Sequence, residues 1–214
     1  MSPDLLNEAP AGIRALPRDH RGFPIPWFVA HQPDGSRDFR VMGGEQLHRA
    51  VKEDRCWVCG GRNHPLKSFV IGPMCAVNRT SGEPPSHPDC ARWSARACPF
   101  LTRPKMRRNE KNLPADATIS PDHLDRNPGV ALVWTTRRYR PWRQERGDGL
   151  FYIGEPVRAE WFAHGRPATR DEVLASIESG LPSLVEVAAI EGPSALRALN
   201  DMTSDAMRHL PVAA

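Results

Sequence analysis

The apolar positions of the chain fall into short runs separated by proline- and glycine-rich segments. Runs rich in β-branched and aromatic residues predict strands at 66–71, 130–136, 149–155 and 156–163, and two looser extended pieces at 22–30 and 38–42. A return strand at 74–77 would form a hairpin with 66–71, because Gly72 and Pro73 favour a turn. Twenty-two prolines in 214 residues, about twice the usual share, agree with short elements and frequent loops.

Helical spacing of apolar residues marks the remaining elements. Residues 45–55 and 87–97 each predict one helix, the second with Pro88 near its first position and Pro99 just beyond its end. In the C-terminal part, Thr169 with Glu172 and Ser183 with Glu186 are capping boxes, which predict two helices, the first ended by Gly180. A last helix at 195–209 would place four apolar residues on one face: Leu196, Leu199, Met202 and Ala206.

Cysteine and histidine spacing predicts a structural zinc site between 56 and 90. Cys56 and Cys59 form a Cys-x-x-Cys turn, followed by two glycines that give it backbone freedom. His87 and Cys90 are three residues apart at a helix start, so their side chains can face the same way. A knuckle, a hairpin and a helix with the second ligand pair follow one another as in a treble-clef finger. We therefore expect Zn²⁺ bound by Cys56, Cys59, His87 and Cys90.

Other interpretations of these residues stay open. Cys56 and Cys59 would alternatively be ordinary buried thiols, or a redox pair in a thioredoxin-like βαβ unit, but the flanking pattern does not predict such a unit. His64 and Cys75 are the rivals of His87 as the fourth ligand. Cys75 and Cys98 otherwise read as buried thiols of the core, since a chain without an export signal favours free thiols over disulfides.

The predicted fold is α+β, a domain of short strands built around a treble-clef-like zinc element and followed by a helical tail. We divide the chain into a loose N-terminal arm at 1–22, a zinc-containing domain at 23–168 and the helical tail at 169–214. Residues 101–128 read as a basic, proline-containing connector within the domain.

The sequence contains no assembled catalytic site, so an enzyme is the least favoured class. Four protein ligands leave no open position on zinc for a water. Treble clefs also occur in HNH-type nucleases, but the helix after His87 has Arg92, Trp93 and Ser94 where such a nuclease needs a metal ligand. A deaminase H-x-E motif is missing. Asp122, His123 and Asp125 would be a metal or acid/base cluster only if their proline-flanked loop brought them together.

Charge is unevenly distributed along the chain. The net formal charge is +4, but residues 101–150 carry 11 basic and 6 acidic side chains, whereas 151–214 carry 5 basic and 9 acidic ones. Arginines alternate with aromatic residues in the predicted loop 137–149, and this composition suits phosphates and unpaired bases. A second basic run extends from Arg103 to Lys111. The candidate nucleic-acid contacts are Arg92, Arg96, Arg137, Arg138, Tyr139, Arg140, Trp142 and Arg143.

Two function classes follow from these features. The first is a nucleic-acid-binding module with structural zinc, for which a single strand or RNA is the favoured ligand. The second is a protein-binding adaptor, or an inhibitor of a host factor, that acts through the helical tail. The arginines would alternatively form a solvated surface paired with the acidic tail. Residues 1–20 lack the pattern of a signal peptide and no run has the length of a membrane span, so we expect a cytoplasmic protein.

Several segments resemble a family of uncharacterised proteins carried by bacteriophages and prophages. The resemblance lies in CWVCG, FVIGPMCAVNR, EPPSHPDC and ACPFL, and in the later segment GRPATRDEVLASIESGLPSL. It implies a phage-encoded protein in the host cytoplasm, and it implies no activity or site residue.

Overall fold

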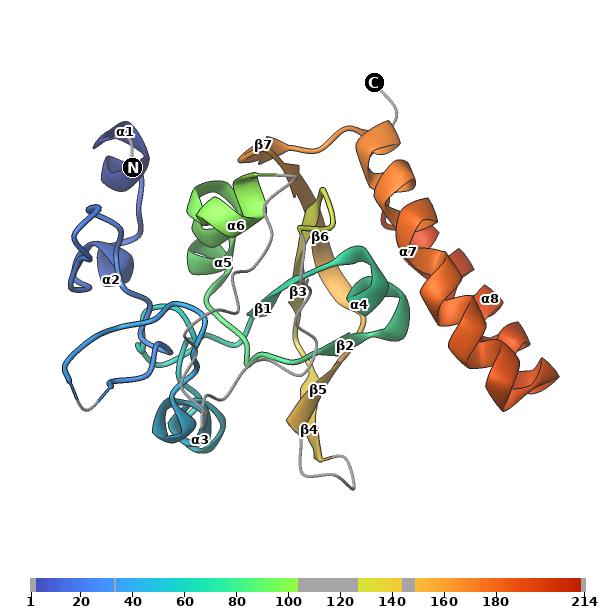
Figure 1. The fold of residues 1–214 in the computed structure, drawn as a ribbon, viewed down its shortest axis with the longest axis horizontal. Helices are drawn as coiled ribbons and strands as arrows, with labels where there is room; N and C mark the ends of the chain where they lie inside the picture. Colours follow the sequence, from blue (N-terminus) through green and yellow to red (C-terminus); the bar gives the residue numbers. More distant parts are fainter. Residues whose placement is uncertain (1–2, 33, 104–126, 144–148, 213–214) are drawn as a thin grey trace.

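The computed structural model describes residues 3–32, 34–103, 127–143 and 149–212, and two antiparallel sheets form its framework (Figure 1). The larger sheet has the order β1-β3-β6-β7, formed by β1 (Lys67–Ile71), β3 (Ala131–Thr136), β6 (Pro156–Ala163) and β7 (Arg166–Pro167). The smaller sheet has the order β2-β5-β4, formed by β2 (Thr80–Ser81), β5 (Gly149–Ile153) and β4 (Tyr139–Arg143). The α+β class predicted from the sequence is confirmed.

Strand β3 is buried on both faces because helices cover both sides of the larger sheet (Figure 1). On one side, α5 (Pro88–Ala97) packs Ala91 and Ala95 against Val133. On the other side, Leu132 and Trp134 belong to the main core, which includes residues of the smaller sheet, of α4 (Pro73–Asn78) and of α7 (Arg170–Glu191). Alternate side chains of one strand therefore pack against different elements, as the pleat requires.

The helical tail consists of α7 and α8 (Pro193–Met207), which lie side by side and extend past the larger sheet (Figure 1). The predicted capping box at Thr169 is confirmed, with the Thr169 hydroxyl accepting from the Glu172 amide at 3.2 Å. The predicted end of the helix at Gly180 is wrong, because α7 continues through Gly180 and Pro182 to Glu191. A Cβ at Gly180 would lie 2.9 Å from the Met74 side chain, so this glycine permits close packing of α7 on α4.

The predicted second capping box, at Ser183 and Glu186, is also wrong. Ser183 lies inside α7 and is exposed, so it starts no new helix. The last helix was predicted at 195–209 and is found at Pro193–Met207, with Leu199 and Ala206 buried against α7 and α4. By length and composition alone, α7 is the one helix among the described residues that would also suit a membrane span, but its first half lies in the main core.

The predicted return strand at 74–77 is wrong, because these residues form helix α4. Pro73 occupies the first helical turn, and Pro73, Ala76 and Val77 are buried at the i, i+3, i+4 spacing of a helix. Strand β1 pairs with β3 along its whole length instead. Strand β1 is nevertheless joined to the segment that precedes α5, because Ser68 and Ser86 exchange two backbone hydrogen bonds, at 2.9 and 2.8 Å.

The N-terminal third of the chain has little regular structure, yet it is packed. Residues 22–30 and 38–42, predicted as extended pieces, form only isolated bridges such as Val29 with Met42. The predicted helix at 45–55 is found as α3 (Gly44–Lys52). Residues 1–22, predicted as a loose arm, include α1 (Pro3–Asn7) and α2 (Ala11–Arg14), and Ile13 is fully buried.

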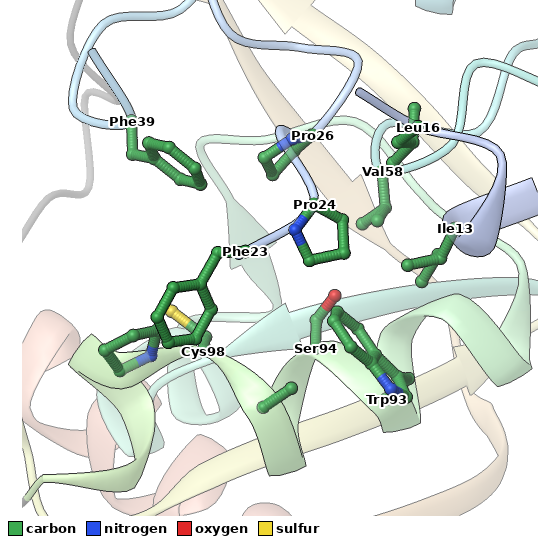
Figure 2. A pocket seen from close by; sticks show the side chains of 12 residues that line it. Ile13, Leu16, Phe23, Pro24, Pro26, Phe39, Val58, Trp93, Ser94 and Cys98 are labelled. Carbon is green, nitrogen blue, oxygen red and sulfur yellow. The ribbon is translucent and has the colours of Figure 1, made fainter. Parts of the chain in front are cut away.

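This N-terminal segment lies against α5. The Trp93 indole N–H donates to the Leu5 carbonyl at 2.8 Å, and an apolar cavity of about 70 Å³ remains between the two elements (Figure 2). Its wall includes Phe23, Phe39 and Trp93. A short helix, α6 (Pro99–Thr102), follows α5. The predicted connector lies mostly at 104–126, outside the described residues, as do Asp122, His123 and Asp125.

Candidate metal centre and basic surface

The first two candidate ligands lie on a tight turn. The Cys56 amide donates to the Gly61 carbonyl at 2.7 Å, and the Gly60 amide donates to the Cys56 carbonyl at 2.8 Å. Gly60 has a φ of +73°, and a Cβ there would lie 2.6 Å from the Trp27 ring. Both the backbone conformation and the contact therefore require glycine directly after Cys59.

The second pair lies at the start of α5. His87 is the N-cap residue, Pro88 follows it, and Cys90 belongs to the first turn. The backbone bridge between Ser68 and Ser86 fixes the chain immediately before His87. The His87 amide donates to the Cys56 sulfur at 3.3 Å, so the helix start and the turn are also joined through a ligand atom.

Four donor atoms converge as the sequence predicted. The sulfurs of Cys56, Cys59 and Cys90 and a ring nitrogen of His87 all lie within 4.8 Å of one another. Nδ1 of His87 is 3.4 Å from the Cys59 sulfur and 3.8 Å from the Cys90 sulfur. In a tetrahedral site with metal–sulfur bonds of about 2.3 Å, neighbouring donors are about 3.5–3.8 Å apart. The cluster therefore has the donor set and the spacing to hold a metal ion.

The second nitrogen of His87 is also fixed. Its Nε2 lies 2.8 Å from the Arg62 carbonyl oxygen, to which it can donate when Nδ1 faces the sulfurs. A metal-ligating histidine usually donates its other N–H in this way, and the bond sets the ring orientation. The arrangement supports His87 over its rivals. His64 lies beside the His87 ring, 4.7 Å between centroids, but is exposed, and Cys75 packs against the main core.

The three thiols and the imidazole share charge unequally. Hydrogen bonds from the Cys59 and Cys90 thiols lower the pKa of Cys56, whereas the hydrogen bond to Cys56 raises the pKa of Cys90. A separate hydrogen bond between His87 and Cys56 raises the pKa of His87. One thiolate is thus stabilised by its neighbours, and further thiolates in so small a volume need a cation to balance their charge.

A second group of potential ligands lies at the end of the tail, and we do not assign a metal to it. Donor atoms of Glu155, Asp205 and His209 lie within 4.8 Å of one another. The Arg79 guanidinium forms ion pairs with Glu155, at 3.2 Å, and with Asp205. It also lies over the Trp134 ring, 4.7 Å from the centroid. A protein cation therefore already balances these carboxylates.

The candidate nucleic-acid contacts on α5 are engaged within the protein. Arg92 forms ion pairs with Glu160 at 2.8 Å and with Asp89 at 2.7 Å. Arg96 forms an ion pair with Glu8 at 2.8 Å. Helix α5, which carries these two arginines, lies on the far side of the larger sheet from the tail, whereas β4, which carries Tyr139–Arg143, lies at the lower end of the molecule in Figure 1. The structure does not bring the two groups together.

The predicted arginine-rich loop is partly a strand. Residues Tyr139–Arg143 form β4 and pair with β5, so only Arg137 and Arg138 lie in a turn, between β3 and β4. Arg137, Arg138 and Arg140 are exposed, and within the described parts of the chain they form no ion pair. The side chains of Trp142 and Arg143 lie outside the described parts, as do the basic residues from Lys105 to Lys111.

Tyr139, which was predicted to contact nucleic acid, packs against the main core instead. The Tyr139 ring packs against Phe69 and Phe151, with centroids 5.6 and 6.1 Å away, and burial raises the pKa of Tyr139. Tyr152, which the sequence analysis missed, is 42% exposed and lies opposite Arg140. The signal was present as period-two alternation, because Phe151 and Ile153 turn inward and Tyr152 must then turn outward.

Comparison with known proteins adds no further identification. No protein-family model, no curated protein and no solved structure matches this chain. Its function has to be inferred from the residues described above.

Proposed function

We propose that this chain is a nucleic-acid-binding protein whose fold is stabilised by a structural zinc ion. The observation that supports binding most directly is the contrast among its arginines. Arg92 and Arg96 are balanced by carboxylates of the protein, whereas Arg137, Arg138 and Arg140 are exposed without such partners in the described residues. Unbalanced guanidinium groups favour an external polyanion, and phosphate oxygens fit their geometry.

Zinc is the metal that the cluster suits best. Three sulfurs and one imidazole nitrogen form a soft donor set typical of structural zinc, and harder ions such as Mg²⁺ or Ca²⁺ prefer oxygen ligands. Four protein donors complete a tetrahedral shell, so the metal would hold the turn at Cys56 against α5 without binding a substrate. We assign no catalytic activity to the chain. The cytoplasmic location and the bacteriophage origin remain part of this proposal, as the sequence suggested them.

The test compares two double variants of equal charge. Arg137→Ala with Arg138→Ala should weaken binding to labelled DNA and RNA, and should reduce the slope of log affinity against log salt by about 1.4 to 1.8 for two lost phosphate contacts. The control is Arg18→Ala with Arg197→Ala, which removes two exposed arginines from α8 and the N-terminal segment. Fluorescence anisotropy at several salt concentrations measures both variants.

Two results would overturn the proposal. One is wild-type binding weaker than about 100 μM to single-stranded DNA, RNA and duplex near physiological salt, which is the weak edge of non-specific affinity. The other is an equal loss of affinity in the control variant, because binding would then depend on the overall charge of the protein and not on the surface around Arg137 and Arg138.

A second candidate function is supported by α7. Val185, Val187 and Ile190 are exposed on the part of α7 that extends past the sheet, and Ile190 is 88% exposed. An apolar helix surface favours a protein partner, as in the adaptor or host-factor inhibitor predicted from the sequence. Co-purification of a partner that survives nuclease treatment and is lost in Ile190→Glu would favour this function. Retention of that partner by Ile190→Glu would reject it.

A further inference from the structure

We infer that the outward face of the smaller sheet is a stacking surface for unpaired bases, with Tyr152 as its aromatic centre, so that the ligand is single-stranded nucleic acid. This inference rests on the nucleic-acid binding proposed above and specifies where and how the bases are held. It depends on strand register, exposure and the arrangement of one arginine over one ring.

The register places three residues in one row across the sheet. Tyr152 in β5 lies opposite Thr80 in β2 and opposite Arg140 in β4. Directly opposite residues project to the same face of a sheet. Their sequence neighbours Phe151 and Ile153 project to the other face and are 3% and 2% exposed in the main core. The row therefore belongs to a face that the core does not cover.

Tyr152 is 42% exposed on this face, so a large part of its aromatic side chain remains accessible to a ligand. The Arg140 guanidinium carbon lies over the ring, 5.2 Å from its centroid. Both groups are planar, and bases stack on tyrosine rings and on guanidinium planes. Arg140 also forms no ion pair with any described carboxylate, so its charge remains available to a phosphate.

The neighbouring charges indicate where the backbone of the ligand would run. Arg137 and Arg138 are exposed in the turn that leads into β4, so the positive charge continues from Arg140 towards one end of the strand. A single-stranded nucleic acid whose bases stack on Tyr152 and Arg140 would place its phosphates along this turn. In a duplex the bases already stack on one another and are not accessible to the ring, which is why the surface fits a single strand.

The experiment replaces Tyr152 by leucine and by phenylalanine in the full-length, metal-loaded protein. Tyr152→Leu keeps an apolar side chain of moderate size but removes the ring, and it should weaken binding to a labelled oligo(dT) about 5- to 150-fold, with an unchanged salt slope. Tyr152→Phe keeps the ring and should bind like the wild type. Duplex binding should be the same for all three proteins, and thermal unfolding checks that each is folded.

The outcomes separate this inference from the broader proposal. If Tyr152→Leu binds oligo(dT) as tightly as the wild type while the Arg137 and Arg138 variant binds more weakly, the stacking surface is rejected and the arginine site stands. If Tyr152→Phe loses as much affinity as Tyr152→Leu, the hydroxyl and not the ring is the contact, and the inference is also wrong. If the wild type binds no nucleic acid, both ideas fail.

Discussion

Two regions of this molecule differ in their strand pairing and in the number of residues that they bury. We call residues 3–64 together with the first turn of α5 the metal lobe, and the two sheets with α4, α7 and α8 the sheet lobe. In its described residues the metal lobe has short helices and isolated bridges, and its buried residues form two small clusters, one around Ile13 and Cys56 and one around Ala50 and Trp57. The sheet lobe buries a larger set of residues around Trp134 and Leu132. Where strand pairing and apolar area are limited, the proposed zinc and its cysteine ligands would take over the role that packing has elsewhere.

The lobes are nevertheless connected through α5 and one backbone bridge. One side of α5 contributes Ala91 and Ala95 to the larger sheet, and its first turn carries Cys90. The bridge between Ser68 and Ser86 joins the first strand of the sheet lobe to the residue before His87. Loss of the proposed metal would therefore either stay local or spread to the sheet lobe through these two connections.

Replacement of a metal ligand should have the largest effect. Cys90→Ser should remove the metal and unfold the metal lobe, because a structural zinc contributes about 10 to 16 kcal/mol of apparent binding free energy. We expect amides of the Cys56 to Gly61 turn to exchange rapidly while those of β3 stay protected. Elemental analysis and hydrogen exchange measure the two effects.

Cys98→Ser is the matched control, because Cys98 lies at the other end of α5, outside the four-residue cluster. It should keep one metal ion per chain. Full metal content in Cys90→Ser would show that the cluster is not the site. Simultaneous loss of protection in the turn and in β3 would show instead that the lobes unfold as one unit.

A cavity in the sheet lobe should have a smaller effect and should not involve the metal. Ile177→Ala removes a side chain that is 1% exposed in the main core, and such changes lower the free energy of unfolding by about 2 to 5 kcal/mol. Ile190→Ala is the same substitution in the same helix at an exposed position, and it should change stability little. Urea unfolding and metal content would measure both variants. Equal losses of stability in Ile177→Ala and Ile190→Ala, or loss of metal in Ile177→Ala, would contradict the division of the molecule into two lobes.

Loss of the α7 cap should have the smallest of the three effects. Thr169→Ala removes the hydroxyl that accepts from the Glu172 amide and should lower stability by about 1 kcal/mol. Ser183→Ala is the control, because Ser183 lies inside α7 and caps nothing. Thermal unfolding of the two variants measures the difference. A larger loss of stability in Ser183→Ala than in Thr169→Ala would instead support the helix boundary that the sequence suggested near Gly180.

The metal cluster could be predicted from the sequence because its signals are local. Two ligands lie within four residues on a glycine-rich turn, and the other two lie within four residues at a proline-marked helix start. Strands β1, β3 and β6 could also be predicted, since their runs of apolar residues are short and clear. The proximity of the two ligand pairs was inferred from the order of elements, and the structure bears it out.

Features that depend on distant partners were not predictable. An apolar run such as 74–77 fits a strand or a buried helix equally well, and packing against α7 and α8 decides in favour of α4. Gly180 would normally end a helix, but Met74, far away in sequence, requires its small size. In β4, Tyr139 turns inward because its ring packs against Phe69 and Phe151. The division at residue 169 stays a prediction, although Val173 and Ile177 tie the tail to the main core.

The close approach of the N-terminal segment to the cluster has a kinetic consequence. A Cβ at Gly12 would lie 3.1 Å from the Cys59 sulfur, and Ala9 and Ile13 pack with Cys56 and Cys90. Cys56 and Cys90 are buried beneath this cover, whereas Cys59 is partly exposed, so a chelator would displace all the ligands only after the segment detaches. The rate of metal transfer would then become independent of chelator concentration and equal the rate at which residues 3–16 open. The half-life of the bound ion would be governed by a small local unfolding event, separately from its equilibrium affinity.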